Sequence, residues 1–298
     1  MAIIVDENTR VLIQGITGRF GEFVTRNMLD TGTRVIAGVT PNRGGESVWG
    51  IPVYDTVREA IERQGEIEAT VIVVPGPGAK QAALEAFNAA TKNVLVEVER
   101  VPLHDALELI AYARRNSIRL LGPGSAGLVS PGKGSLGLFG SPEELAKIAW
   151  VPGRIGVISR SGGQTSTLAW SVCRAGLGIS TAVNLGSEPV LGTTLSELLP
   201  LFQDDDETDG IVYFGEIGTA LEEDAAELIR NGGYTKPLVA HIAGRGLPAG
   251  LRFSHASAIV EGGRGTAESK IKALESAGAQ IVDKLEDLAS ILEKIFKR

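Results

Sequence analysis

Short apolar segments alternate with longer amphipathic ones through the first 120 residues of the chain. The apolar segments, rich in Val, Ile and Leu, are the expected strands: VLIQG from Val11, RVIAGV from Arg34, ATVIVV from Ala69, NVLVEV from Asn93 and RLLG from Arg119. Helical stretches such as EFVTRNMLD, AKQAALEAFNAA and LHDALELIAYARR separate them. Continuous apolar strands joined by helices predict a parallel sheet that is covered on both faces.

Beyond a segment rich in Gly, Pro and Ser (residues 122–140), the same alternation begins again. The expected strands are RIGVIS, ISTAVN, GIVYFG, PLVAHIAG and AQIVD, with helical patterns near Thr165, Thr194, Leu221 and Ala267 and a last one from Leu285 to Lys297. We therefore predict an α/β chain with a Rossmann-like domain over residues 1–122 and a flavodoxin-like domain over residues 123–298. The Gly-rich segment is the expected connection. A single large sheet is the alternative.

Composition and charge narrow the class of protein. Hydrophobic residues make up 43% of the 298 residues and charged residues 22%, which suits two globular domains. The net charge of -7 disfavours nucleic acid as a partner, because a phosphate backbone attracts basic surfaces. No apolar run approaches the roughly 18 residues of a membrane span, and MAIIVDENTR lacks the basic start of a secretion signal. A single cysteine excludes a cysteine-based metal site. We expect a cytoplasmic protein with no membrane partner and no metal site.

Three glycines follow the first expected strand at the start of a helix. Gly15, Gly18 and Gly21 allow a tight turn and a close approach of ligand to backbone, and the helix start favours an anionic phosphate. Ordinary packing between helix and strand is the alternative. A dinucleotide site usually has an acidic residue after the next strand, but this chain has Arg43 there. A cation suits the extra phosphate of NADP or CoA, unless Arg43 is only a solvated turn residue.

One of the three histidines has an unusual setting. His255 lies in RFSHASAIVEGGRGTAESK, where small neighbours leave room for a large group on a nucleophilic imidazole. Two expected helix starts could hold a phosphoryl group: one at Ser159, Ser161, Gly162 and Gly163, which offer N–H groups and hydroxyls, and one near Gly265. The alternative is an ordinary loop histidine beside a glycine turn.

At these residues the chain resembles the α subunit of succinyl-CoA synthetase over nearly its whole length. The matching landmarks, in family order, are IVDENTRVLIQGITG, GVTPNRGGESVWGIPVYDTVREA, VVPGPGAKQAALEA, GRIGVISRSGG, YFGEIG and SHASAIVEGGRGTAESKIKALESAGA. The resemblance implies a CoA-binding first domain and a ligase second domain. It assigns CoA contacts to Thr17, Gly18, Arg19, Phe20, Arg43, Glu97, Val98 and Glu99.

The resemblance also implies the catalytic residues. His255 matches the phosphorylated histidine, although the glycines that flank it in the family are Ser254 and Ser257 here. Glu216, in GEIG, matches a carboxylate that would orient the imidazole through its second ring nitrogen. Acid and phosphate contacts would come from Ser159, Ser161, Gly162, Gly163 and Ser166.

The implied activity is an ADP- or GDP-forming acid–CoA ligase of which this chain is one subunit. ATP or GTP and Mg²⁺ would bind a β subunit with an ATP-grasp domain. A succinate-type dicarboxylate is the first expectation for the acid. Ser166 stands where the family usually has tyrosine, so a bulkier acid could fit. Arg100, which replaces a glycine of the family, could add a carboxylate partner or be a surface residue. The alternatives are a citryl-CoA or malyl-CoA synthetase subunit, or a non-catalytic CoA- or NADP-binding regulatory protein.

Overall fold

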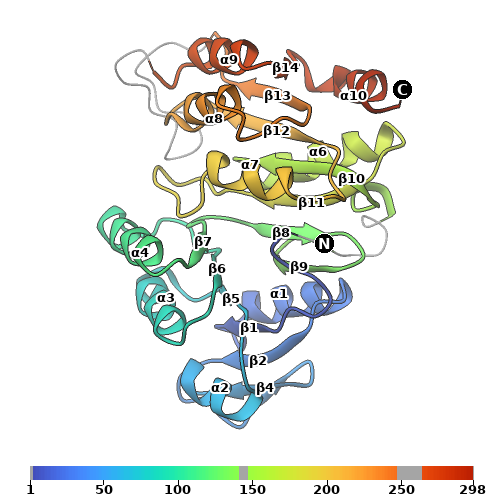
Figure 1. Cartoon of the computed structure of the whole chain (residues 1–298). Coiled ribbons are helices and arrows are strands. Elements are labelled where there is room, and N and C mark those ends of the chain that lie inside the picture. The colour runs from blue at the N-terminus through green and yellow to red at the C-terminus, as the bar shows by residue number, and fades with distance from the viewer. Residues whose placement is uncertain (1–2, 141–146, 247–263, 298) are drawn as a thin grey trace. The chain divides into compact units, whose positions relative to one another are not determined.

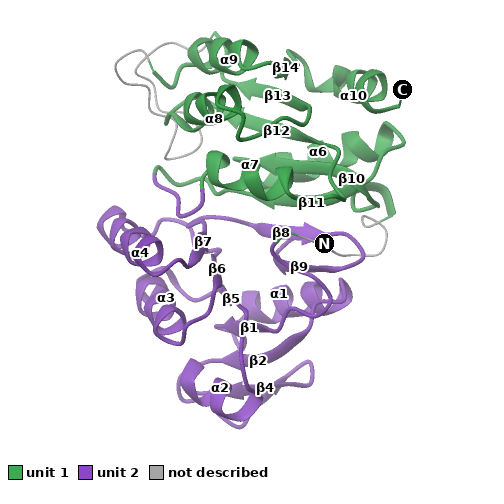
Figure 2. Cartoon of the chain, in the orientation of Figure 1, with its two compact units in different colours: residues 1–3, 143–189, 194–298 green, residues 4–142, 190–193 purple. Residues whose placement is uncertain are grey.

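The computed structural model describes residues 3–140, 147–246 and 264–297. The chain forms two compact units, coloured separately in Figure 2: unit 2 contains residues 4–142 and 190–193, and unit 1 contains residues 1–3, 143–189 and 194–298. The first boundary between the two units falls after residue 142, later in the chain than the domain boundary expected after residue 122. As a domain boundary, residue 122 stays a prediction.

Unit 2 is built on a seven-stranded sheet in the order β3-β4-β2-β1-β5-β6-β7 (Figure 1). The strands are β1 (Val11–Gln14), β2 (Val35–Val39), β3 (Ser47–Val48), β4 (Ile51–Tyr54), β5 (Ala69–Ile72), β6 (Asn93–Val96) and β7 (Arg119–Leu121). All neighbours pair in parallel except β3 and β4. The five predicted strands are confirmed as β1, β2, β5, β6 and β7; the short β3–β4 pair was not expected.

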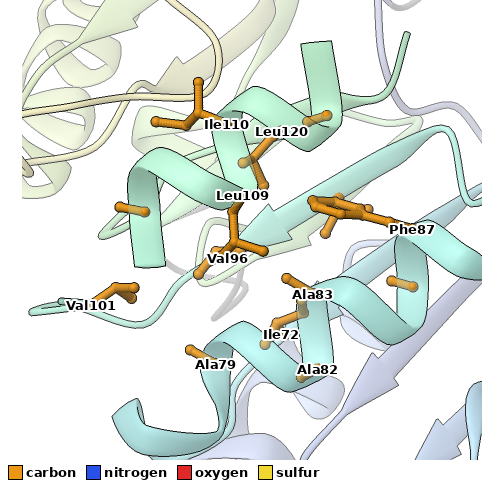
Figure 3. Packing of buried hydrophobic residues seen from close by; sticks show 14 residues of the cluster. Ile72, Ala79, Ala82, Ala83, Phe87, Val96, Val101, Leu109, Ile110 and Leu120 are labelled. Carbon is orange, nitrogen blue, oxygen red and sulfur yellow. The ribbon is translucent and has the colours of Figure 1, made fainter. Parts of the chain in front are cut away.

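The helices of unit 2 bury their apolar faces on this sheet. They are α1 (Arg19–Asp30), α2 (Val57–Gln64), α3 (Ala79–Asn88) and α4 (Leu103–Arg115), with a 3₁₀ turn η1 (Gly76–Gly78) before α3. Figure 3 shows α3 and α4 packing on β5, β6 and β7. Phe87 of α3 anchors this cluster and stacks on Tyr112 of α4 with ring centroids 5.4 Å apart. Burying one such side chain contributes about 1.5–3 kcal/mol to the free energy of folding.

The Gly-rich segment is a buried hairpin of unit 2 and not merely a connection. Strands β8 (Gly127–Ser130) and β9 (Gly134–Gly137) pair antiparallel. Gly127 has φ +98°, and a Cβ there would lie 1.9 Å from the Leu136 carbonyl oxygen, so only glycine allows this approach. The hairpin joins α1 through Asn27, whose side-chain amide donates to the Leu138 carbonyl over 3.1 Å.

Residues 190–193 return to unit 2 after the chain has entered unit 1. The Gly192 N–H donates to the Gly122 carbonyl over 2.8 Å, and the Thr193 hydroxyl donates to the Leu120 carbonyl, also over 2.8 Å. This short return therefore completes the end of β7.

Unit 1 contains parallel strands in the order β14-β13-β12-β10-β11. They are β10 (Pro152–Ser159), β11 (Ile179–Asn184), β12 (Gly210–Glu216), β13 (Leu238–Ala243) and β14 (Gln280–Ile281). The described helices are α6 (Gly162–Arg174), α7 (Leu195–Gln203), α8 (Leu221–Arg230), α9 (Ala267–Ser276) and α10 (Leu288–Phe296), with a 3₁₀ turn η2 (Leu285–Asp287). Two parallel-dominated sheets confirm the predicted α/β class.

Candidate functional site

A cavity of about 400 Å³ opens at the carboxyl edge of the sheet in unit 2. Residues that follow β1, β2 and β5 line it, together with the start of α3. The chain runs from β1 to β2 on one side and later reaches β5 on the other side of β1. Ligands of open α/β sheets bind at such a reversal of strand order, so the cavity occupies the expected position. Its lining residues are Gln14, Gly15, Thr17, Gly18, Val39, Thr40, Pro41, Val73, Val74, Pro75, Gly78, Gln81, Ala82 and Glu85.

The glycine motif shapes the β1–α1 turn beside this cavity. Gly15 adopts φ +88°, and Gly18 is the N-cap of α1, with no side chain capping the helix. A Cβ at Gly21 would lie 2.1 Å from the Gly15 carbonyl oxygen, so glycine lets α1 approach β1 closely. The N–H groups at the start of α1 are therefore available to an anionic ligand.

The predicted CoA contacts do not all meet in this cavity. Thr17 and Gly18 line it, while Arg19 and Phe20 begin α1 with exposed side chains. Residues Glu97–Glu99 follow β6 and are not among the lining residues. The lining residues Gln81 and Glu85 were missed by the sequence analysis, although their spacing of four on a predicted helix places them on one face.

Arg43 lies in the turn after β2, where it already has a carboxylate partner. Its Nη2 donates to Glu46 Oε2 over 2.6 Å, and its Nε also bonds to Glu46. Both side chains are about half exposed. The hydrogen bond and charge of Glu46 raise the pKa of Arg43, and Arg43 lowers the pKa of Glu46. A phosphate that binds Arg43 must therefore compete with Glu46.

Glu97 is a buried carboxyl group at the end of β6. Only 9% of the residue is exposed, and its Oε2 has no hydrogen-bond partner among the described residues. Burial raises the pKa of Glu97 to about 8. The group is therefore mainly protonated at neutral pH and can donate a hydrogen bond to a ligand.

Unit 1 has a second candidate site where β10 leads into α6. Ser161 is the N-cap of α6, and no side chain caps the helix, so the N–H groups near Gly162 and Gly163 can donate to an anion. Ser166 lies one turn further along and is exposed. Strand β10 lies between β11 and β12, so this helix start also sits at a reversal of strand order.

The hydroxyl of Ser159 points into the β10–α6 turn, so its expected contact with a ligand stays a prediction. Ser159 is fully buried; its Oγ donates to the Ser161 carbonyl over 2.9 Å and accepts from the Ser161 N–H over 3.0 Å. Both bonds lie within the turn, so Ser159 fixes the shape of the helix start.

The structure places Glu216 beside this helix start, at the end of β12. Strands β10 and β12 are parallel neighbours, with Ser159 opposite Phe214. Arg160 Nε lies 3.8 Å from Glu216 Oε1, and the two side chains are 2% and 13% exposed. Arg160 also donates through Nη2 to the Glu188 carbonyl over 3.3 Å, while its Nη1 has no partner among the described residues. Arg160 was not among the predicted site residues, which in this motif were the serines and glycines around it.

At the second expected helix start, near Gly265, two N–H groups already have side-chain partners within the protein. The Thr266 side chain caps α9 by accepting from the Ser269 N–H over 2.9 Å, and the Gly265 N–H donates to Glu223 Oε1 over 2.9 Å. His255 lies outside the described residues. Among residues 3–140, 147–246 and 264–297, no group of three or more acidic, His or Cys side chains could hold a metal ion. Within the same ranges, the helices are all too short or too polar to cross a membrane.

Two domain families match the chain in the order of the two sites. The CoA binding domain family matches residues 6–99, which include the cavity of unit 2. The CoA-ligase family matches residues 158–280, which include the β10–α6 turn and Glu216. Together they define the CoA-binding subunit of an acid–thiol ligase.

The similarity extends over the whole chain. An alpha subunit of ADP-forming succinate–CoA ligase from Archaeoglobus fulgidus is 46% identical over 295 residues, 99% of this chain and 100% of that protein. A subunit of ADP-forming sulfoacetate-CoA ligase from Acholeplasma sp is 39% identical, also over 295 residues, 99% of this chain and 98% of that protein. The chain belongs to the family of succinate–CoA ligase alpha subunits.

A solved structure shares the fold. ATP citrate lyase from Methanothrix soehngenii, in complex with citrate and coenzyme A, aligns with a TM-score of 0.92 at 24% identity. The alignment covers 99% of this chain and 50% of that chain, so this chain spans half the length of the lyase.

The Arg43–Glu46 pair predicts opposite effects of two substitutions on CoA binding. Arg43→Ala should weaken CoA binding about tenfold, because a charge-assisted contact to a phosphate is lost. Glu46→Gln should strengthen it about two- to fivefold, because it removes the competing carboxylate from an exposed pair. Calorimetric titration with CoA measures both. If Arg43 contacts the 3′-phosphate, all three proteins should bind dephospho-CoA equally; a full loss with dephospho-CoA would move Arg43 to the diphosphate.

Burial of Glu97 predicts a loss of stability as pH rises. The pKa of Glu97 in the folded chain is about 8, whereas its ordinary value is 4.5. The unfolded chain therefore releases this proton first, so stability falls between pH 4.5 and pH 8. Glu97→Gln should remove this loss and raise the free energy of unfolding relative to the original protein by roughly 3–4 kcal/mol more at pH 9 than at pH 5. Urea denaturation at both pH values measures this, with the exposed Glu99→Gln as control. Equal pH dependence of the Glu97→Gln variant and the original protein would contradict it.

Proposed function

We propose that this chain carries the phosphoryl group of an acid–CoA ligase on His255. The γ-phosphoryl group of a nucleoside triphosphate passes to the imidazole, releasing the diphosphate, and then to the carboxylate of the acid. The CoA thiol attacks the carbonyl carbon of this acyl phosphate, which forms the thioester and releases inorganic phosphate. Every step exchanges one bond to phosphorus or carbon for another, so no oxidant or reductant is required.

The observation that carries this proposal is the pairing of an uncapped helix start with a partly buried carboxylate, Glu216. The N–H groups at the start of α6 offer positive potential to a phosphoryl group. Glu216 lies at the end of the neighbouring strand, fixed beside Arg160. A carboxylate there can accept a hydrogen bond from one nitrogen of an imidazole and leave the other nitrogen nucleophilic.

A partner subunit supplies the nucleotide site in this proposal. Relatives at 46% and 44% identity are named alpha subunits, which implies a β subunit. We place Mg²⁺ and ATP or GTP on that subunit, as an ATP-grasp domain would provide. The cytoplasmic location expected from the sequence stays a prediction.

The acid is proposed to be a dicarboxylate of the succinate type, with citrate or malate as the second candidate. Several relatives at 40–46% identity are named succinate–CoA ligase subunits. Ser166, exposed in the second turn of α6, stands where the family usually has tyrosine, and this favours a bulkier or hydroxylated acid. The relative named for sulfoacetate shows that similar chains differ in their acid.

His255→Asn is expected to abolish phosphorylation of this chain. The complex with its β subunit is incubated with γ-labelled ATP or GTP, and separately with acyl-CoA and labelled phosphate. The original protein should acquire an acid-labile, base-stable mark, because phosphohistidine has that chemistry. His104→Asn is the matched control, since that imidazole is 88% exposed on α4. Equal labelling of the His255→Asn variant and the original protein would refute the proposal.

The identity of the acid is tested with the reconstituted complex. Succinate, malate, citrate, itaconate and sulfoacetate are compared by kcat/KM with ATP and GTP. Ser166→Tyr should shift preference toward succinate by about tenfold if residue 166 borders the acid, since a filled pocket discriminates by about 1–3 kcal/mol. An unchanged order of acids in the Ser166→Tyr variant would remove Ser166 from the acid site.

A further inference from the structure

A buried lysine donates a hydrogen bond to the main chain of Glu216. Lys270, on α9, is 1% exposed, and its Nζ donates to the Glu216 carbonyl over 2.7 Å and to the Gly218 carbonyl over 2.5 Å. The third acceptor is the carboxylate of Glu222, which is fully buried on α8. An ammonium group has three donors, so Lys270 satisfies all of them inside the protein.

The backbone that Lys270 holds is strained. Gly218 has φ +89°, and the next residue, Thr219, has φ +56°, a region that β-branched residues rarely adopt. The Gly218 N–H donates to the Gly265 carbonyl over 2.7 Å, so the turn is tied from both its N–H and its carbonyl side. Strained backbone of this kind persists only where its surroundings enforce it.

The second carboxylate oxygen of Glu222 also has a hydrogen-bond partner. Tyr213, fully buried on β12, donates its hydroxyl to Glu222 Oε1 over 2.8 Å. Burial and the charge of Glu222 raise the pKa of Tyr213 well above its ordinary value, so this phenol stays a neutral donor. Glu222 is thus held by a cation on one oxygen and by a hydroxyl on the other.

A buried ion pair is not required for stability at such a place. Apolar residues of similar volume often stabilise a core equally well, whereas removal of one partner leaves an uncompensated charge. What apolar side chains cannot do is bind two main-chain carbonyls at once. The specific contribution of Lys270 is therefore its contact with the carbonyls on either side of residue 217.

We propose that Lys270 is a positioning residue that fixes the Glu216 carboxylate for phosphoryl transfer. Lys270 binds the main-chain carbonyl of Glu216. Arg160 faces the Glu216 carboxylate, with 3.8 Å between Arg160 Nε and Glu216 Oε1. This inference rests on the proposed function, in which Glu216 orients the imidazole. A displacement of about 1 Å at a reacting group can slow a reaction about a hundredfold, so loss of the Lys270 contacts should slow phosphoryl transfer.

The test uses the complex of this chain with its β subunit. The principal variant is Lys270→Met with Glu222→Gln, which removes the ion pair without leaving a buried charge. Tyr213→Phe is the matched control, because it removes a bond to Glu222 and leaves the two carbonyl contacts in place. Lys270→Gln with Glu222→Gln is made alongside, since an amide can satisfy part of the acceptor set and keeps the test open if the first variant does not fold.

Three quantities are measured: the single-turnover rate of labelling from ATP, the dissociation constant of CoA, and the melting temperature. Both Lys270 variants should label at least about tenfold more slowly, with CoA binding unchanged, because the CoA cavity lies in unit 2. Tyr213→Phe should label within about twofold of the original protein. A folded Lys270 variant that is labelled as fast as the original protein would overturn the inference.

A combination with Glu216→Gln separates positioning from a general structural effect. If Lys270 acts through Glu216, adding the Lys270→Met and Glu222→Gln changes to Glu216→Gln should slow labelling no further than about twofold. If the combined variant instead loses the product of the two separate rate losses, Lys270 acts independently of Glu216, and the inference would be overturned. Absence of labelling in the original complex would instead refute the proposed function.

Discussion

Parallel strands that are buried on both faces confine polar chemistry to the carboxyl edge of a sheet. Both units obey this constraint, because continuous apolar strands leave no room for a charged ligand along their length. Each unit opens a site beside its first central strand, where the strand order reverses. The helix that follows that strand begins without a side-chain cap in both cases, at Gly18 and at Ser161. The same arrangement therefore occurs twice, and it leaves an uncapped helix start at the carboxyl edge of each sheet.

The sequence was sufficient for the features that depend on local pattern. Apolar runs predicted the central strands of both sheets, and the glycine spacing predicted the turn at Gly15 and Gly18. The hairpin of β8 and β9 could not be predicted in the same way. Its Gly-rich residues resemble a connection, and their role follows from distant partners such as Asn27, which is 111 residues away from Leu138.

The candidate site likewise combines features that a local motif predicts with features that depend on contacts distant in the sequence. The serines and glycines of SRSGG were recognised from a short motif. The burial of the Ser159 hydroxyl within its own turn, and of the Arg160 side chain between them, could not be read from that motif. Lys270 looks like a solvated residue in AESKIKALES, because lysine is rarely buried unless paired. Its partners at Glu216 and Gly218 lie far earlier in the chain, at separations of 54 and 52 residues. Local sequence carries no signal of such contacts.

The return of residues 190–193 to unit 2 has a consequence for the order in which the chain folds during synthesis. Domains generally fold as units while they leave the ribosome, the N-terminal one first. Here the end of β7 lacks its partners Gly192 and Thr193 until residues 143–189 of unit 1 have been made. Completion of the CoA-binding unit is thus coupled to translation of the ligase unit. A nascent chain that stops before this return would present an unfinished sheet edge to chaperones and proteases.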